Sequence, residues 1–436
     1  MNPFDRDQQA LLAELSARGV ATSSELQAAL GKSQPTLSRL LAALSSQVLT
    51  VGRGRKTRYA IARPIFGQPA QQPLWWIDDA GMPRRLGTLS LLGDGSVVHV
   101  AGAGFDDIVR DRLPWYLAPL KPQGFLGRLL AQRLAPSGLA SNPESWGVEM
   151  SLFAALQLHD APGAIVLGEP AAPAAHHPIP LDAKDAGTAL DELAADVART
   201  LPAGSSAGGE QPKFLALLES GEHVIVKFTP LRGTPFGERW HELLHAEAVA
   251  AEVLARHGVA VAAGRIVETA RRSYLLSPRF DRVGANGRRH AVAVGAVHQA
   301  FVAGPYANWA GTCEALARQG RLDRIGGDQA RALLEFGRLI GNSDMHSGNL
   351  SLMVELDGLA AGRFALAPVY DMLPMRWRPD PVMGGAADYT PFEPDPVCLV
   401  GPSRAPAHEF WSELARRQGA GKELRQVASE MARRLS

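Results

Sequence analysis

The sequence predicts an α+β protein in three parts: a small helical module with a hairpin, a β-rich middle, and a two-lobed C-terminal domain whose second lobe is mostly helical. Three observations support this. Residues 1–63 contain three short helical patterns and then two strand patterns around a basic turn. Runs of β-branched and aromatic residues next alternate with Gly/Asp turns. Beyond residue 188, a strand-rich stretch precedes a long helical one.

Length and composition limit the class of protein. At 436 residues, the chain suggests about three domains of ~150 residues each. The net charge is only +1, and two cysteines, Cys313 and Cys398, are too few for a disulfide framework or a cysteine-based zinc site. The N-terminus lacks the pattern of a signal peptide, and no apolar run reaches the ~18 residues of a membrane span. We therefore expect a cytoplasmic protein without a membrane partner.

The first 63 residues have the pattern of a small DNA-binding module. The stretch DQQALLAELSARG stops at Gly19, TSSELQAALG ends at Gly31, and SQPTLSRLLAALSS carries Pro35 in its first turn, where proline is tolerated. VLTVGRGRKTRYAIA reads as two strands around a Gly-Arg-Gly-Arg-Lys turn. Three helices and a hairpin predict a winged helix-turn-helix, whose third helix enters the major groove.

Charge supports DNA binding by this module. Residues 1–63 contain nine Lys or Arg against four acidic residues, a net charge of +5. We expect the third helix to present base-contacting side chains, namely Gln34, Thr36, Ser38 and Arg39. We expect the hairpin to meet phosphates with Arg53, Arg55, Lys56 and Arg58. Double-stranded DNA is therefore the expected partner, bound by a homodimer or at paired half-sites, and a protein-contact module is the alternative.

The middle of the chain predicts a β-rich subdomain over residues 74–180, after a Pro/Gln linker, RPIFGQPAQQP. Residues 74–100 alternate strand runs with turns, and RDRLPWYLAPLKPQGFLGRLLAQRL then turns helical. The C-terminal domain is expected over residues 188–435. It begins with a helix, then strands near Phe214–Leu218 and His223–Phe228, a helix ending at Gly258, and two more strands. From Ala307 the chain is mostly helical.

The stretch GNSDMHSGNLSLM holds Asp344, His346 and Asn349 within six residues. A surface loop is one interpretation, because Asn, Asp, Ser and Gly, which are frequent here, are turn residues. A metal cluster is another, but it lacks the usual paired histidines or nearby cysteines. The third is a phosphoryl-transfer loop, because Asp344 and Asn349 are five apart, as in kinases. There the Asp accepts the proton of the attacking hydroxyl and the Asn holds a metal ion on the phosphates.

Other parts of such an enzyme occur in the expected order. The stretch SSAGGEQPK offers a glycine loop for phosphate, with Lys213 as an added cation. Lys227 lies at the end of an apolar strand, where a kinase has the lysine that contacts the α- and β-phosphates. The acid that holds this lysine is expected on the next helix, and we prefer Glu247 to Glu252 for this role. Asp371 comes after a strand and Tyr370, in the position of a second metal-binding Asp. Each feature has an ordinary structural explanation, but their order predicts a protein-kinase-like bilobal domain.

Together SSAGGEQPK, SPRFDR, GNSDMHSGNLS and APVYDMLP resemble the HipA family of serine/threonine kinase toxins, over roughly residues 74–435. The resemblance implies ATP and Mg²⁺ as cofactors, Asp344 as catalytic base, Asn349 and Asp371 as metal ligands, and Lys227 on phosphate. It implies that a loop covers the phosphates, made of Gly208, Gly209, Glu210, Gln211, Pro212 and Lys213. It places an adenine hinge at Pro278, Arg279 and Phe280, and His346, Ser347 and Gly348 on the nucleotide side of the catalytic loop.

The family also autophosphorylates a glycine-loop serine, for which Ser205 and Ser206 both qualify. Two departures stand out. Pro278 lacks the N–H that a hinge residue donates, and the DNA-binding module is fused to the chain, as in the YjjJ-like branch, whereas the family's usual DNA-binding partner is a separate antitoxin. Self-regulation and a separate antitoxin both stay open.

These features predict an ATP-dependent serine/threonine protein kinase of HipA type with a DNA-binding module, acting on a protein substrate. Two alternatives remain. A small-molecule phosphotransferase also uses an Asp-x4-Asn loop, although its usual HGD is NSD here. A transcription regulator could bind nucleotide as an effector without chemistry, although such a fold need not keep the base.

Overall fold

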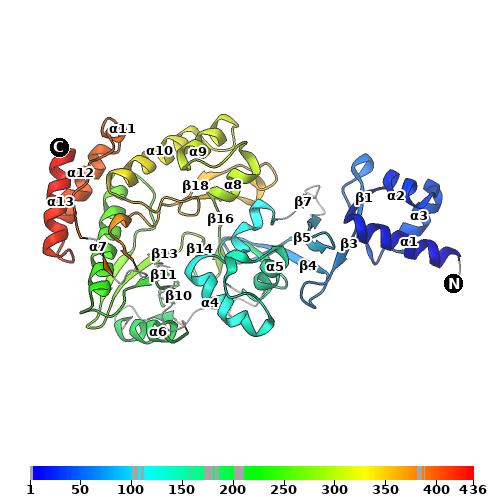
Figure 1. The fold of residues 1–436 in the computed structure, drawn as a ribbon, viewed down its shortest axis with the longest axis horizontal. Helices are drawn as coiled ribbons and strands as arrows, with labels where there is room; N and C mark the ends of the chain where they lie inside the picture. The colour runs from blue at the N-terminus through cyan, green and yellow to red at the C-terminus, as the bar shows by residue number, and fades with distance from the viewer. Residues whose placement is uncertain are drawn as a thin grey trace.

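The computed structural model describes residues 3–100, 107–109, 112–158, 160–170, 180–181, 186–200, 211–380, 385–386 and 388–436. The N-terminal module lies at one end of the molecule and the last two helices lie at the other, with the β-rich middle between them (Figure 1). Among the described residues, no helix is both long and apolar enough to span a bilayer.

The N-terminal module has the predicted three helices and two-stranded hairpin. Gly19, with φ of +74°, ends the first helix, and Gly31, with φ of +63°, ends the second. Thr22 caps the second helix, and Glu25 completes the capping box. The elements are α1 (Pro3–Arg18), β1 (Val20–Thr22), α2 (Ser23–Leu30), α3 (Gln34–Ala43), β2 (Val48–Val51), the short helix η1 (Gly54–Lys56) and β3 (Arg58–Arg63). Leucines of all three helices form its core. The winged helix-turn-helix itself stays a prediction.

The prediction of a linker after this module is wrong. Strand β3 pairs with β1 and β2, and its last two residues, Ala62 and Arg63, pair with the middle sheet. Ile65 in the expected linker is fully buried, and Arg63 forms an ion pair of 2.7 Å with Glu149. The proline and glutamine residues suggested an exposed linker. Instead, Ile65 and Gln68 form a tight turn through backbone hydrogen bonds, and the Ile65 side chain packs in the core. The module therefore shares one continuous sheet with the middle of the chain (Figure 1).

The middle is an antiparallel sheet covered by helices, as expected. Its strands are β4 (Gln71–Ile77), β5 (Pro83–Leu92), β6 (Val97–Val100), β7 (Asp107–Val109) and β8 (Ile165–Leu167). Its helices are η2 (Trp115–Leu120), α4 (Gly124–Leu134), η3 (Ala135–Ser137), η4 (Pro143–Ser145) and α5 (Val148–Leu156). One apolar core joins this part to the second lobe of the C-terminal domain, with Leu74 and Trp76 in the same cluster as Val292 and Trp309.

The first lobe of the C-terminal domain is a five-stranded sheet in the order β12-β13-β11-β10-β9. Alternating apolar residues on β10 and β11 form its core with helix α6, through Leu190 and Phe214, while Leu244 of α7 packs on Leu275 of β13. The elements are β9 (Pro180–Leu181), α6 (Ala186–Thr200), β10 (Lys213–Leu218), β11 (His223–Phe228), α7 (Pro235–Arg256), β12 (Arg265–Glu268) and β13 (Ser273–Pro278).

The second lobe is mostly helical around a small sheet, β16-β17-β18, and the loop predicted to be catalytic enters this sheet. Its strands are β14 (Arg282–Val283), β15 (Gly287–Arg288), β16 (His290–Ala293), β17 (Ser351–Val354), β18 (Ala365–Leu366), β19 (Pro379–Asp380) and β20 (Gly385–Ala386). Its helices are α8 (Val294–Phe301), α9 (Trp309–Arg318), α10 (Arg324–Leu339), η7 (Leu356–Gly358), η8 (Met375–Trp377), α11 (Pro396–Leu399), α12 (Arg404–Leu414) and α13 (Lys422–Leu435).

Candidate functional site

A cavity of about 1510 Å³ lies between the two lobes and the middle of the chain. Apolar side chains of β10 and β11, including Leu215 and Ile225, form one wall. Residues 277–281, which end β13 and follow it, form a second wall, and residues 346–348 of the Asp-x4-Asn loop form a third. Residues of the middle, such as Trp115 and Trp146, also line the cavity. The cavity is large enough for a nucleotide and part of a second molecule.

Three charged residues that the sequence singled out meet at the cavity wall. Lys227, at the end of β11, forms ion pairs with Glu247 of α7 and with Asp371. Burial by itself lowers the pKa of Lys227, but the two carboxylates outweigh burial and raise it. Burial raises the pKa of Glu247, whereas Lys227 overcomes burial and lowers the pKa of Asp371. The lysine therefore remains a cation, held between the buried Glu247 and the half-buried Asp371, whose side chain is 27% exposed.

Glu247 and Glu252 have different surroundings, although both lie on α7. The Glu252 carboxylate accepts two hydrogen bonds of 3.1 Å from Arg417, which follows the end of α12. Glu247 is 6% exposed, and its Oε2 has no hydrogen-bond partner among the described residues. A buried carboxylate oxygen without a hydrogen-bond partner costs free energy. Such an unpaired oxygen is more typical of a functional site than of a structural ion pair.

Asp344 and Asn349 close one loop through the backbone. The Nδ2 of Asn349 donates to the Asp344 carbonyl at 2.7 Å, and this bond turns the amide oxygen of Asn349 the opposite way. The Asp344 side chain is 39% exposed, and its Oδ1 lies 4.0 Å from the Nε2 of His346. His346, Ser347 and Gly348 line the cavity, but Asp344 and Asn349 do not.

Asn342, which is not among the predicted site residues, joins this loop to Asp371. Its Oδ1 accepts from the Asp344 backbone N–H at 2.9 Å, and its Nδ2 donates to the Asp371 carbonyl at 3.2 Å. Asp371 has φ of +55°, a left-handed conformation that non-glycine residues rarely adopt. Strain of this kind persists only where surrounding contacts impose it. An Asn two residues before the Asp was the only sequence signal for this link.

Tyr370 fixes the other side of the loop. Its hydroxyl donates to the Gly348 carbonyl at 2.8 Å and lies 2.8 Å from the hydroxyl of Ser351. Its ring stacks on Phe280, with 5.7 Å between centroids and 26° between planes. Burial raises the pKa of Tyr370, so the phenol stays protonated and can donate. The aromatic pair forms an apolar face of the cavity.

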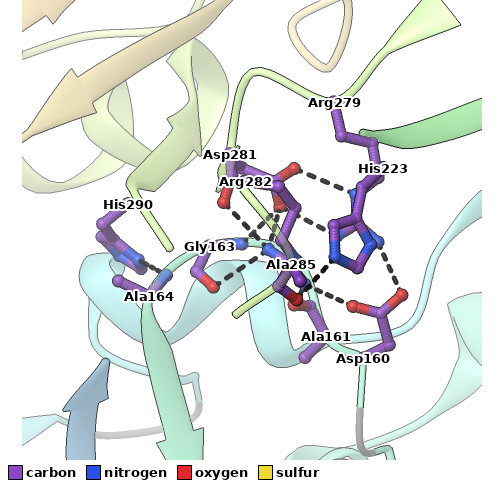
Figure 2. Close-up of polar contacts among 10 residues, drawn as sticks. All are labelled: Asp160, Ala161, Gly163, Ala164, His223, Arg279, Asp281, Arg282, Ala285 and His290. Atoms are coloured by element: carbon purple, nitrogen blue, oxygen red, sulfur yellow. Dashed lines mark hydrogen bonds and ion pairs between the residues drawn. The ribbon is translucent and has the colours of Figure 1, made fainter. Parts of the chain in front are cut away.

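The predicted hinge is held by a buried ionic network (Figure 2). Arg279 contacts Asp160 at 2.6 Å and Asp281 at 2.9 Å, while Arg282 contacts the same two carboxylates at 2.5 and 2.7 Å. Each arginine side chain is 3% exposed. The Arg279 backbone N–H donates to the His223 carbonyl at 2.9 Å. Neither Pro278 nor Arg279 therefore has a backbone N–H left for a nucleotide base, and Phe280 contributes its ring.

Asp160 of the network comes from the loop before β8, so the middle of the chain supports the hinge directly (Figure 2). Neighbouring contacts join the same two parts: Gly163 N–H donates to Asp281 at 2.9 Å and Ala164 N–H to His290 at 3.2 Å. No sequence pattern indicates this network, because Asp160 lies more than a hundred residues before Arg279 and Arg282.

The other predicted site residues lie in three places. Lys213 begins β10 and lines the cavity, Pro212 precedes it, and Gln211 is buried. Gly208, Gly209, Glu210, Ser205 and Ser206 lie outside the described residues. The predicted DNA contacts lie on the N-terminal module, at one end of the molecule (Figure 1). Thr36 is half-buried. The other predicted contacts are exposed, namely Gln34, Ser38, Arg39, Arg53, Arg55, Lys56 and Arg58.

Comparisons with known proteins agree with this arrangement. A family model described as the HipA-like C-terminal domain matches residues 205–436, and one described as the YjjJ-like toxin middle domain matches residues 68–176. The two-lobed domain and its cavity thus define a protein of the HipA-like class. Toxin YjjJ of Escherichia coli (strain K12) is 36% identical over 438 residues, which cover 97% of each chain. The chain belongs to the family of HipA-like toxins, in its YjjJ-like branch, and the predicted family is confirmed.

A solved structure shows the same fold. HipA of Shewanella oneidensis MR-1, from a toxin–antitoxin complex with HipB and operator DNA, superposes with a TM-score of 0.56. The match has 15% identity and covers 83% of this chain and 96% of that chain. The match supports a mixed α/β fold for the chain.

Proposed function

We propose that the chain is a cytosolic, ATP-dependent serine/threonine protein kinase of HipA toxin type that also binds DNA through its N-terminal module. The observation that carries this proposal is the cluster of Lys227, Glu247 and Asp371 in the cavity wall, tied through Asn342 to the loop with Asp344 and Asn349. This arrangement supports the proposal, because phosphoryl transfer needs a lysine on phosphate, an acid that holds it, metal ligands and a base.

The residues present fit ATP and Mg²⁺. Mg²⁺ takes oxygen ligands, and the Asp371 carboxylate and the Asn349 amide oxygen would hold it, since the Asn349 nitrogen is already used by the Asp344 carbonyl. When bound, Mg²⁺ neutralises charge on the phosphates. Lys227 and Lys213 supply further positive charge at the same wall. Glu247 keeps Lys227 in place through its ion pair.

Asp344 acts as the base in this proposal. Its carboxylate is 39% exposed, so an acceptor hydroxyl can approach it from solvent and give up its proton there. The Asn342 contact to its backbone N–H and the Asn349 contact to its carbonyl fix the position of the residue. Residues 208–213 would cover the phosphates. The Phe280–Tyr370 pair, with Leu215 and Ile225, would enclose the adenine, because these apolar groups line the same cavity.

Assaying different acceptors tests the reaction class. The full chain is incubated with ATP, Mg²⁺ and either protein acceptors or sugar and choline acceptors, and labelled products are mapped by mass spectrometry. The proposal expects phosphate on serine or threonine, including on the chain itself. Phosphate on the small molecules alone would favour a small-molecule phosphotransferase. Nucleotide binding without any transfer would favour a transcription regulator that senses nucleotide.

We also propose that residues 1–63 form a DNA-binding winged helix-turn-helix, with residues 74–180 and 188–435 as the middle and kinase domains. The net charge of +5 in residues 1–63 and the exposed basic side chains around η1 support the first assignment. In the Shewanella complex, HipA was solved with HipB and operator DNA. Here a basic module belongs to the toxin chain itself, so self-regulation at DNA is the simplest arrangement, with dimerisation providing paired half-sites.

A further inference from the structure

A second cluster of potential ligands lies on α7, outside the cavity. His241 and His245 are four residues apart, which places both rings on one face of the helix. Their ring centroids are 4.7 Å apart, and each residue is 6% exposed. The sequence between them, HELLH, has the H-E-x-x-H spacing of helical zinc sites. Buried paired imidazoles at this spacing can serve as two ligands of one metal ion.

A carboxylate completes the set. Glu268, at the end of β12, places its Oε1 3.1 Å from the Nε2 of His245. One ligand atom from each of His241, His245 and Glu268 lies within 4.8 Å of the others. Two histidines and a glutamate are an established ligand set for zinc. We propose that His241, His245 and Glu268 bind a divalent transition-metal ion, with Zn²⁺ the best match, and so join α7 to β12.

The surrounding contacts resemble those around metal ligands. The Nδ1 of His241 lies 2.7 Å from the Ser273 hydroxyl, which leaves its Nε2 to face the cluster. The Oε2 of Glu268 accepts from Arg232 at 3.0 Å, so Oε1 points to the histidines. Metal-binding histidines and carboxylates commonly have their second polar atom fixed in this way. The Glu268 side chain is 42% exposed, which gives an ion a path from solvent.

The glutamate inside the motif excludes a peptidase-type site. In H-E-x-x-H peptidases this residue is the general base at the metal. Here Glu242 accepts from the Tyr389 hydroxyl at 2.5 Å and from the Gly421 backbone N–H at 2.8 Å. Both oxygens are therefore used for packing against the C-terminal part of the chain. The site would stabilise structure: it would fix the helix that carries Glu247, two residues after His245.

Arg417 competes with the metal. Its Nε donates to the Nδ1 of His245 at 3.5 Å, while Glu252 holds its guanidinium. This bond favours the form of His245 that carries its proton on Nε2 and donates to Glu268. Metal binding at Nε2 requires the proton on Nδ1, facing Arg417. Removing Arg417 should therefore tighten metal binding, whereas a cluster with no affinity for metal would show no such effect.

The test is a zinc titration of the full chain, made without a histidine tag and stripped with a chelator. Calorimetry should show one Zn²⁺ per chain, and Zn²⁺ should raise the melting temperature. Glu268→Gln and His245→Gln keep similar shapes and should each weaken binding by about tenfold or more. Arg417→Gln should bind more tightly than the natural chain.

His257→Gln is the matched control, because His257 follows α7 and contacts a glutamate, Glu409, at 2.7 Å, with no third ligand among the residues that the structure describes. Its zinc affinity should equal that of the natural chain. Variants are first compared by circular dichroism in the absence of metal, so that only folded proteins are titrated. Absence of zinc binding at micromolar concentrations would overturn the proposal, as would equal affinities in the natural chain, Glu268→Gln and His245→Gln.

Discussion

Replacing Asp160 with alanine tests whether the middle of the chain supports the nucleotide hinge. Asp160 accepts from Arg279 at 2.6 Å and from Arg282 at 2.5 Å, and its side chain is 21% exposed. Burial alone would raise the pKa of Asp160, but the two arginines outweigh burial and lower it. Asp160→Ala would leave two buried guanidinium groups with Asp281 as their shared carboxylate (Figure 2).

The expected loss follows from this burial. Removing one partner of a buried ion pair costs about 3–5 kcal/mol, because the remaining charge stays desolvated. At about 2 °C per kcal/mol for a domain this large, the melting temperature should fall by about 6–10 °C. The KM for ATP should also rise, because Phe280 lies between Arg279 and Asp281 and loses its fixed position. The assays are thermal denaturation and steady-state kinetics.

Asp79→Ala is the matched control. Asp79 also joins the middle to the C-terminal domain, through Arg289 at 2.9 Å, but the two side chains are 56% and 49% exposed. An exposed pair of this kind is worth about 0–1 kcal/mol, so stability and KM should barely change. Equal losses of stability in Asp79→Ala and Asp160→Ala would refute the reasoning that burial makes the hinge network important.

Three further predictions concern DNA, pH and the glycine loop. Arg39→Ala should cost about 1–3 kcal/mol of binding free energy on a preferred DNA site and relax specificity. Arg55→Ala should weaken binding to all duplexes alike and lower the slope of log binding constant against log salt concentration by about one unit. Equal behaviour of the two variants in duplex titrations would contradict these roles. Burial lowers the pKa of His290 to about 4. Below about pH 6.5 the unfolded chain therefore takes up a proton that the folded chain does not, so the free energy of unfolding decreases as the pH is lowered. From neutral pH to about pH 5 this residue should account for a loss of about 2 kcal/mol, which His290→Gln should remove in denaturation curves, and an unchanged slope would disprove it. Phosphate on Ser205 or Ser206 should lower ATP affinity by like-charge repulsion, and equal nucleotide binding by phosphorylated and phosphatase-treated protein would rule this out.

Local patterns predicted much of the fold. Glycines marked the helix ends at Gly19 and Gly31, where the backbone turns left-handed. Alternating apolar residues predicted strand β11 (His223–Phe228) with its observed bounds. The order of Lys227, Glu247 and Asp371 predicted three residues that the structure brings into contact. These features depend on periodicity, turn chemistry and motif order, which a single sequence carries.

Contacts between distant segments could not be predicted in the same way. The continuation of β3 into the middle sheet depends on two residue pairs, Ala62 with Leu92 and Arg63 with Leu91. The hinge network depends on Asp160 meeting arginines more than a hundred residues later. Such contacts between distant segments stabilise the fold strongly when they are buried, but no local sequence pattern predicts them. The HELLH motif was readable, yet only the structure brings Glu268 to it.

The most direct test of the proposed kinase is phosphoryl transfer by Asp344→Asn. Asparagine keeps the size of the side chain and removes the base, so autophosphorylation with labelled ATP and Mg²⁺ should fall by about 10²–10⁴-fold. ATP binding should persist, because Asp344 does not line the cavity. Asp357→Asn, at an 85% exposed acid of the same lobe, is the control and should leave transfer unchanged. Transfer by Asp344→Asn at the rate of the natural chain would contradict the assignment of this loop as catalytic.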